Sequence, residues 1–223
     1  MESNGKVTLY IDYLSQPSRA VLAFCLINRI PVVLVETQIV RGDTEAASFA
    51  AISPTRTVPT MTHNGLALYE STSILIYLAS TFATPEHWYP SSPELQGKIN
   101  VYLHWHHLNV RYGCGHYYYR KQVRPLFSNR GFSKDFEEEM LFVQEKSFML
   151  LENTLSNFRY VAETEEISIA DLVCYTEVVH LHLINFDFSK YPKVQAWMDR
   201  VSRIPGVQKA HETFNSYLNS YKL

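Results

Sequence analysis

The sequence is poor in cysteine, in net charge and in long apolar runs. Its three cysteines are Cys25, Cys114 and Cys174, and no two of them form a Cys-x-x-Cys pair. An odd number of widely spaced cysteines argues against a disulfide framework and favours reduced thiols. Lys and Arg number 20 and Asp and Glu 22, so the net charge of −2 argues against a nucleic-acid binder. Because no run of 18 apolar residues occurs, no membrane-spanning helix is expected.

Neither end of the sequence carries a clear targeting pattern. Residues 1–6 lack the basic region and following apolar segment of a secretory signal. The last three residues, Tyr221-Lys222-Leu223, resemble the Ser-Lys-Leu peroxisomal signal only weakly, because Tyr221 replaces a small residue. We therefore expect a cytoplasmic protein.

The first 83 residues alternate between strand and helix patterns. Asn64-Gly65 is a strong signal for a hairpin. Residues 31–38 are apolar and β-branched, which predicts a strand buried on both faces. The order β-α-β-α-β-β-α predicts a small α/β domain with a mixed sheet, which resembles the thioredoxin-like fold. The predicted elements are strands at 6–11, 31–38, 60–62 and 67–69, and helices from Pro17, at 44–51 and from Ser71.

A proline-rich segment then separates this domain from a purely helical one. Pro85, Pro90 and Pro93 mark residues 84–93 as a linker. After residue 83 lie 11 of the 15 tyrosines and 8 of the 9 histidines, so both residue types are concentrated in the second part of the chain. We predict a domain at 1–83, a linker at 84–93 and an all-α domain at 94–223. Its helices are predicted at 94–119, 136–158, from a capping box at Ser168 and Asp171, at 191–201 and at 205–219.

Six motifs stand out in this arrangement. They are residues 9–21 (LYIDYLSQPSRAV), Val58-Pro59, Glu70-Ser71, His87-Trp88-Tyr89-Pro90, residues 105–111 (WHHLNVR) and residues 168–172 (SIADL). Together, over nearly the whole chain, these motifs are similar to those of the theta-class glutathione transferases. The resemblance implies an enzyme that conjugates reduced glutathione, its co-substrate, to small hydrophobic electrophiles such as halides, epoxides or peroxides. It also implies detoxification, a homodimer, an electrophile pocket in the helical domain, and no metal, nucleic-acid or membrane partner.

Ser15 is the candidate catalytic residue of this family pattern. Glutathione must react as a thiolate, and a free thiol with a pKa of about 8.5 is mostly protonated at neutral pH. A hydroxyl that donates a hydrogen bond to the sulfur, beside the positive end of a helix, stabilises the anion. The alternative is that Ser15 only caps the helix that follows it.

The resemblance assigns glutathione binding to two further segments. Pro59, in Thr57-Val58-Pro59, resembles a cis-proline that lets the Val58 backbone pair with the extended tripeptide; the alternative is an ordinary trans-proline. Ser71 and the following helix start can hold the glutamyl carboxylate, while Glu70 pairs with the amino group. For this pair the alternative is a simple helix cap.

Arg111 occupies the position of a theta-class arginine that faces the active site. Its guanidinium can pair with a carboxylate of glutathione or with a leaving anion. A surface ion pair is the equally supported alternative.

Three residues depart from the family pattern where basic side chains are frequent. Thr44, Glu45 and Thr57 stand there, and in the family those cations meet the glycine carboxylate of glutathione. The replacements predict weaker glutathione binding, or transfer of the task to Arg41 or Arg56. Each lost charge-assisted hydrogen bond is worth about 1.5–3 kcal/mol.

Two other functions stay open at this point. The departures motivate a non-catalytic binding or assembly module of the same fold with weak glutathione affinity. The spacing of His104, His107 and Cys114 on one helix face motivates a metal-dependent or ligand-sensing protein. Arg111 lies among these three residues and would repel a cation, so no metal is expected.

Overall fold

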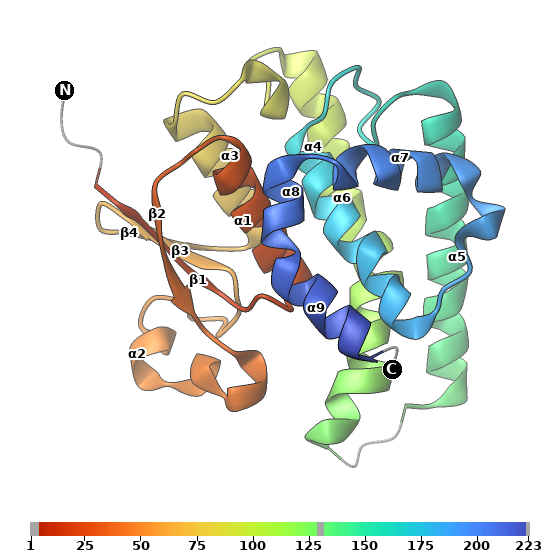
Figure 1. Ribbon diagram of the computed structural model, residues 1–223, viewed down its shortest axis with the longest axis horizontal. Helices are drawn as coiled ribbons and strands as arrows, with labels where there is room; N and C mark the ends of the chain where they lie inside the picture. The colour runs from red at the N-terminus through yellow and green to blue at the C-terminus, as the bar shows by residue number, and fades with distance from the viewer. Residues whose placement is uncertain (1–4, 129–131, 222–223) are drawn as a thin grey trace. The chain divides into compact units, whose positions relative to one another are not determined.

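The computed structural model describes residues 5–128 and 132–221, which fall into two compact units (Figure 1). The first unit contains the described residues up to Tyr89 and those from Ser202 onward, and the second is Pro90–Val201. The sequence predicted a boundary within 84–93 and placed everything after it in the helical domain. In the structure, the last two helices instead belong to the first unit.

The first unit contains the mixed sheet that the strand pattern predicted. Its order is β2-β1-β3-β4, with β1 and β2 parallel and the other pairs antiparallel. In register, Thr60 of β3 lies opposite both Tyr10 of β1 and Tyr69 of β4. The thioredoxin-like arrangement of the sequence analysis is confirmed. The strands are β1 (Val7–Ile11), β2 (Val32–Glu36), β3 (Thr60–His63) and β4 (Leu66–Tyr69).

The expectation that the second strand is buried on both faces is wrong. Val33, Leu34 and Val35 of β2 are 42%, 39% and 37% exposed, because β2 is an edge strand with β1 as its neighbour in the sheet. A run of β-branched residues favours strand formation at the centre and at the edge of a sheet alike. Composition therefore predicted the strand correctly but not its place in the sheet.

The helices of the first unit include two from the C-terminal part of the chain. α8 packs closely against α1, since a Cβ added at Gly206 would lie 2.6 Å from Ile27 Cγ1. Trp88, in the proline-rich segment, packs edge-on against Phe24 of α1 at 5.4 Å between ring centres. The helices are α1 (Gln16–Ile27), α2 (Ala47–Ala50), α3 (Ser71–Thr81), α8 (Pro205–Ala210) and α9 (Glu212–Tyr221).

The second unit is helical, as predicted. The capping box is confirmed: Asp171 accepts the Ser168 N–H at 2.9 Å, and Ser168 Oγ accepts the Ala170 N–H at 3.3 Å. Trp197 Nε1 also donates to Asp171 at 3.0 Å. Among the described residues, no helix is both long and apolar enough to cross a membrane. The helices are α4 (Pro93–Leu108), α5 (Lys134–Asn157), α6 (Ile169–His180) and α7 (Pro192–Ser202).

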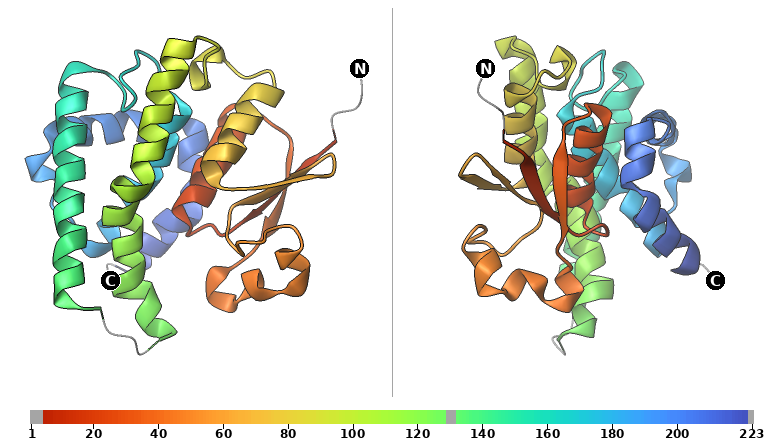
Figure 2. Two further views of the ribbon diagram at one scale, coloured as in Figure 1. Left: turned by 180° about the vertical axis from the view of Figure 1, so that it is seen from behind. Right: turned by 60° about the vertical axis from the view of Figure 1, so that its left-hand side comes forward.

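The predicted helix over 94–119 is not continuous. α4 ends at Leu108, and π-helical turns follow at Tyr112–His116 and Tyr119–Val123. Figure 2 shows α5 running alongside this segment. Gln144 of α5 crosses so closely that its Nε2 donates to the Gly113 carbonyl at 2.6 Å. Glycine lowers the stability of a helix, but its lack of a side chain lets α5 come close to the backbone at Gly113. The close crossing and the π-helical turn therefore occur at the same place.

Candidate active site

The segments predicted to bind glutathione in the first unit meet at one end of its sheet. Because Thr60 lies opposite Tyr10 and Tyr69, the end of β1, the start of β3 and the end of β4 share this end. Parallel β2 also finishes there, so residues 37–57 begin and end at the same place. Ser15, the Val58-Pro59 peptide and the Glu70-Ser71 pair are therefore carried by neighbouring loops.

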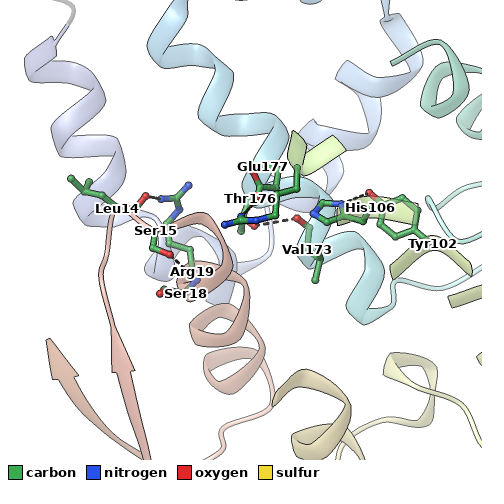
Figure 3. Close-up of polar contacts among 10 residues, drawn as sticks. Leu14, Ser15, Ser18, Arg19, Tyr102, His106, Val173, Thr176 and Glu177 are labelled. Carbon is green, nitrogen blue, oxygen red and sulfur yellow. Dashed lines mark hydrogen bonds and ion pairs between the residues drawn. The ribbon is translucent and has the colours of Figure 1, made fainter. Parts of the chain in front are cut away.

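Ser15 is the N-cap residue of α1. Its Oγ accepts the Ser18 N–H at 3.4 Å, and its side chain is almost fully buried (Figure 3). The capping interpretation therefore describes a real contact. A hydroxyl that accepts one hydrogen bond still has a proton to donate. The cap is thus compatible with donation from Ser15 to an anion at the helix end.

The loop that carries Ser15 is held by Asp12, a buried residue that the sequence analysis did not identify. One carboxylate oxygen of Asp12 accepts the Leu14 N–H at 2.8 Å, and the other accepts the Ile39 N–H at 3.0 Å. Asp12 thus links the Ser15 loop to the segment that follows β2. The contact joins positions 27 residues apart, and no local pattern in the sequence signals it.

Arg19 supports the same loop from the first turn of α1. Its side chain is completely buried, and its Nη1 donates to the Leu14 carbonyl at 2.7 Å (Figure 3). Its guanidinium lies 4.1 Å from the ring centre of Phe214 in α9. Burial and the Arg19 charge together lower the pKa of His211 to about 3. The permanent positive charge of Arg19 is therefore buried between the Ser15 loop and Phe214 of α9.

The Val58-Pro59 peptide is cis, so the cis state expected from the resemblance is confirmed. The preceding carbonyl, that of Thr57, accepts Thr60 Oγ1 at 2.8 Å and Ser53 Oγ at 3.3 Å, which holds the loop in place. Among the described residues, no group forms a hydrogen bond with the backbone N–H or C=O of Val58. Unpaired backbone groups of a buried residue are costly, and an extended ligand would satisfy them.

Glu70 and Ser71 form the other open polar position. Glu70 has a φ of 69°, which is unusual for a non-glycine residue, and α3 begins directly after it without a side-chain cap. The N–H groups of this helix start can therefore bind a carboxylate. The Glu70 side chain is exposed and forms no ion pair within the described chain, so it can accept a ligand amino group.

The three residues that depart from the family pattern, Thr44, Glu45 and Thr57, all lie in the segment between β2 and β3. Thr44 is buried, and the Thr57 hydroxyl lies 2.8 Å from that of Thr55. Glu45 and Arg56 form an ion pair, with 2.6 Å between Glu45 Oε2 and Arg56 Nη1. Of the two arginines considered as substitutes, Arg56 is thus engaged by an acidic side chain, while Arg41 lies exposed at the end of a short 3-10 turn.

Arg111 lies in the helical unit, where it forms an ion pair with Glu177 of α6. The Glu177 side chain is 2% exposed and that of Arg111 is 28% exposed. The ion-pair alternative is therefore present, although it is more buried than a surface pair. A guanidinium has five N–H donors, so one carboxylate contact leaves others for an anion. The two residues are 66 positions apart, and no local pattern in the sequence indicates their contact.

The histidine-rich segment does not form the single face that the spacing predicted. His104 is exposed and contacts the Asn100 carbonyl at 2.7 Å, whereas Cys114 is completely buried. Burial raises the pKa of the Cys114 thiol well above its usual value. The end of α4 at Leu108 breaks the helical spacing between them. The described part of the chain contains no group of three or more metal-ligating side chains.

Comparisons with known proteins agree with this architecture. The family model for the N-terminal domain of glutathione S-transferases matches residues 9–86, and that for the C-terminal domain matches residues 120–205. Mouse glutathione S-transferase theta-3 is 32% identical over 92% of this chain and 86% of its own length.

Solved human structures are similar over nearly the whole chain. Apo glutathione S-transferase T1-1 has a TM-score of 0.83 at 32% identity, over 93% of this chain and 88% of that one. A theta-class enzyme in complex with the glutathione conjugate of 1-menaphthyl sulfate has a TM-score of 0.88 at 28% identity, over 97% and 90%. Together with the cis peptide and the open helix start, these similarities show that the chain belongs to the theta class of the glutathione S-transferase family.

Proposed function

We propose that this chain conjugates reduced glutathione to small electrophiles and that the Ser15 hydroxyl stabilises the attacking thiolate. The sulfur belongs to glutathione, so Ser15 acts as a hydrogen-bond donor and not as the nucleophile. Its position at the start of α1 adds the positive end of the helix, which also favours an anion. Both effects lower the pKa of the bound thiol and increase the thiolate fraction at neutral pH.

We further propose how glutathione lies in the first unit. Its cysteinyl backbone pairs with Val58 after Thr57 and before cis-Pro59, and its glutamyl carboxylate binds the open start of α3 at Ser71. Glu70 receives the glutamyl amino group. The observation that carries this proposal is that the Val58 backbone and the α3 start are both open at the sheet end that carries Ser15.

The helical unit is proposed to supply the electrophile pocket, with Arg111 contributing to the binding of an anion. The human theta-class structure with a menaphthyl conjugate supports an aralkyl substrate for this chain too. A cytoplasmic detoxification role is inferred from the family and from the three free, buried cysteines.

We also infer a twofold homodimer, the commonest symmetry of soluble oligomers. The helical unit contains a groove of about 470 Å³ whose lining is mostly apolar. Val101 at this groove is 71% exposed and Leu150 is 48% exposed, and both would be covered by a second copy. The lining comes from α4, from α5 and from residues 161–163.

The test is Ser15→Ala, with Ser15→Thr as the control that keeps a hydroxyl. A hydrogen bond to a charged group is worth about 1.5–3 kcal/mol, so the pKa of bound glutathione should rise by about one to two units. The turnover rate at neutral pH should fall about 10- to 100-fold, while the glutathione Kd changes less than twofold. Thiolate absorbance against pH, steady-state kinetics and calorimetry measure the three quantities.

An unchanged thiol pKa in Ser15→Ala would refute the role of Ser15. Failure of the wild-type protein to bind millimolar glutathione would refute the proposed reaction. Binding without turnover of any electrophile would instead favour the alternative, a non-catalytic module with weak glutathione affinity. The Glu45–Arg56 ion pair is the observation that favours this alternative.

A further inference from the structure

The Glu45–Arg56 ion pair lies in the loop where the family pattern is broken. Arg56 has a φ of 53°, and its N–H donates to the Ser53 carbonyl at 2.9 Å, so a turn fixes its backbone. Its Nη1 lies 2.6 Å from a Glu45 carboxylate oxygen and 3.0 Å from the Glu45 carbonyl oxygen. One guanidinium nitrogen is thus held by two oxygens of the same residue.

The direction of a bound tripeptide follows from the sheet. Tyr69 lies opposite Thr60, so Val58 precedes this pair by two positions and Ser71 follows it by two, at the same end of the sheet. Arg56 lies two positions before Val58 along the chain. When the glutamyl end of glutathione is held at Ser71 and its cysteinyl backbone at Val58, the glycine lies on the side of Val58 away from Ser71. One extended residue spans about 3.3–3.6 Å, so the glycine carboxylate comes within reach of the Arg56 side chain.

We propose that the Glu45 carboxylate occupies the position on Arg56 that the glycine carboxylate of glutathione takes when it binds. This inference rests on the proposed function. Glutathione must then exchange one carboxylate for another at the same guanidinium, and Glu45 sets how tightly the tripeptide binds. Glu45 is therefore a determinant of affinity for the glycine end of the substrate.

The local contacts allow this exchange. The side chains of Arg56 and Glu45 are 44% and 68% exposed, so water can replace their contact at low cost. The bond from Arg56 to the Glu45 carbonyl does not depend on the carboxylate, and it keeps the guanidinium in place after exchange. Thr57 provides no cation at this position, because its side chain is uncharged, and its hydroxyl lies against that of Thr55.

The test compares the affinities of two ligands for the wild-type protein and for variants at Glu45 and Arg56. Calorimetry measures reduced glutathione and its glycine monoethyl ester, which lacks the glycine charge, against the wild-type protein and Glu45→Gln. Exposed ion pairs are worth up to about fivefold in an equilibrium constant, so Glu45→Gln should bind glutathione about three- to fivefold more tightly. Affinity for the ester should change less than 1.5-fold, and Arg56→Gln should abolish the gain.

Glu138→Gln is the matched control. It removes the same charge from an ion pair on α5, where Glu138 is 65% exposed, and glutathione affinity should not change. Unchanged or weaker glutathione binding by Glu45→Gln overturns the inference and leaves the proposed function standing. An equal gain for the ester also overturns it, because the glycine charge would then play no part. Absence of glutathione binding in every variant refutes the proposed function and this inference with it.

Discussion

Gly113→Ala should destabilise the helical unit at the point where α5 crosses the π-helical turn. A methyl group at this position would lie 2.6 Å from Gln144 Cα and 2.8 Å from Gln144 N. These are backbone atoms of a helix, so they cannot rotate away as the end of a side chain can. The adjacent hydrogen bond from Gln144 Nε2 to the Gly113 carbonyl would have to lengthen as the segments separate.

The magnitude follows from two opposing effects. Forcing an extra methyl group into a packed site costs about 1–3 kcal/mol. Replacing glycine with alanine in a helix returns about 1 kcal/mol. The net loss for Gly113→Ala should therefore lie at the upper end of the difference, at about 2 kcal/mol, because the atoms that the methyl group meets are backbone atoms of α5. Gly97→Ala is the control in α4, because no atom lies within 4 Å of its added methyl group, and it should stabilise by up to about 1 kcal/mol.

Urea denaturation followed by circular dichroism, at one protein concentration, measures both variants. The unfolding midpoint should decrease for Gly113→Ala and increase for Gly97→Ala, with unchanged slopes. A Gly113→Ala protein as stable as the wild type would refute the reasoning. It would mean that α5 can move away from the added methyl group without a loss of stability.

Two further outcomes are expected. Burial and Arg19 lower the pKa of His211 to about 3, whereas the unfolded chain takes up this proton near pH 6.5. The stability that His211 contributes is thus complete above pH 6.5. As the pH falls from 6.5 toward 3, the free energy of unfolding decreases by at most about 1.4 kcal/mol per pH unit because of this residue. In thermal melts at a series of pH values, His211→Gln should reduce this dependence on pH. Val101→Glu should shift the proposed dimer to a monomer in light scattering, whereas Phe142→Glu, at an exposed site outside the groove lining, should not.

The sequence predicted the parts of the site that depend on local structure. Ser15 precedes a helix and Ser71 begins one, and both follow strands whose patterns are clear. A hairpin signal at Asn64-Gly65 fixed the last two strands. The cis state of Pro59 came from the resemblance, because general frequencies favour trans.

Contacts between distant residues were not predictable from one sequence. Arg111 meets Glu177 across 66 positions, and Asp12 reaches Ile39 across 27. Neither pair leaves a periodic or compositional signal. The sequence predicts Arg56 as a cation for glutathione, yet the contact of Arg56 with Glu45 depends on a turn at Ser53–Arg56 that no sequence pattern indicates.

The discontinuous first unit has a consequence for biosynthesis. A ribosome delivers the sheet with α1 and α3 first, then the whole helical unit, and last the two helices that complete the first unit. Until α8 emerges, the surface of α1 around Ile27 has no cover from Gly206 and its neighbours, and Arg19 lacks Phe214. Native folding of the nascent first unit must therefore wait until α8 and α9 have been synthesised, after the whole helical unit.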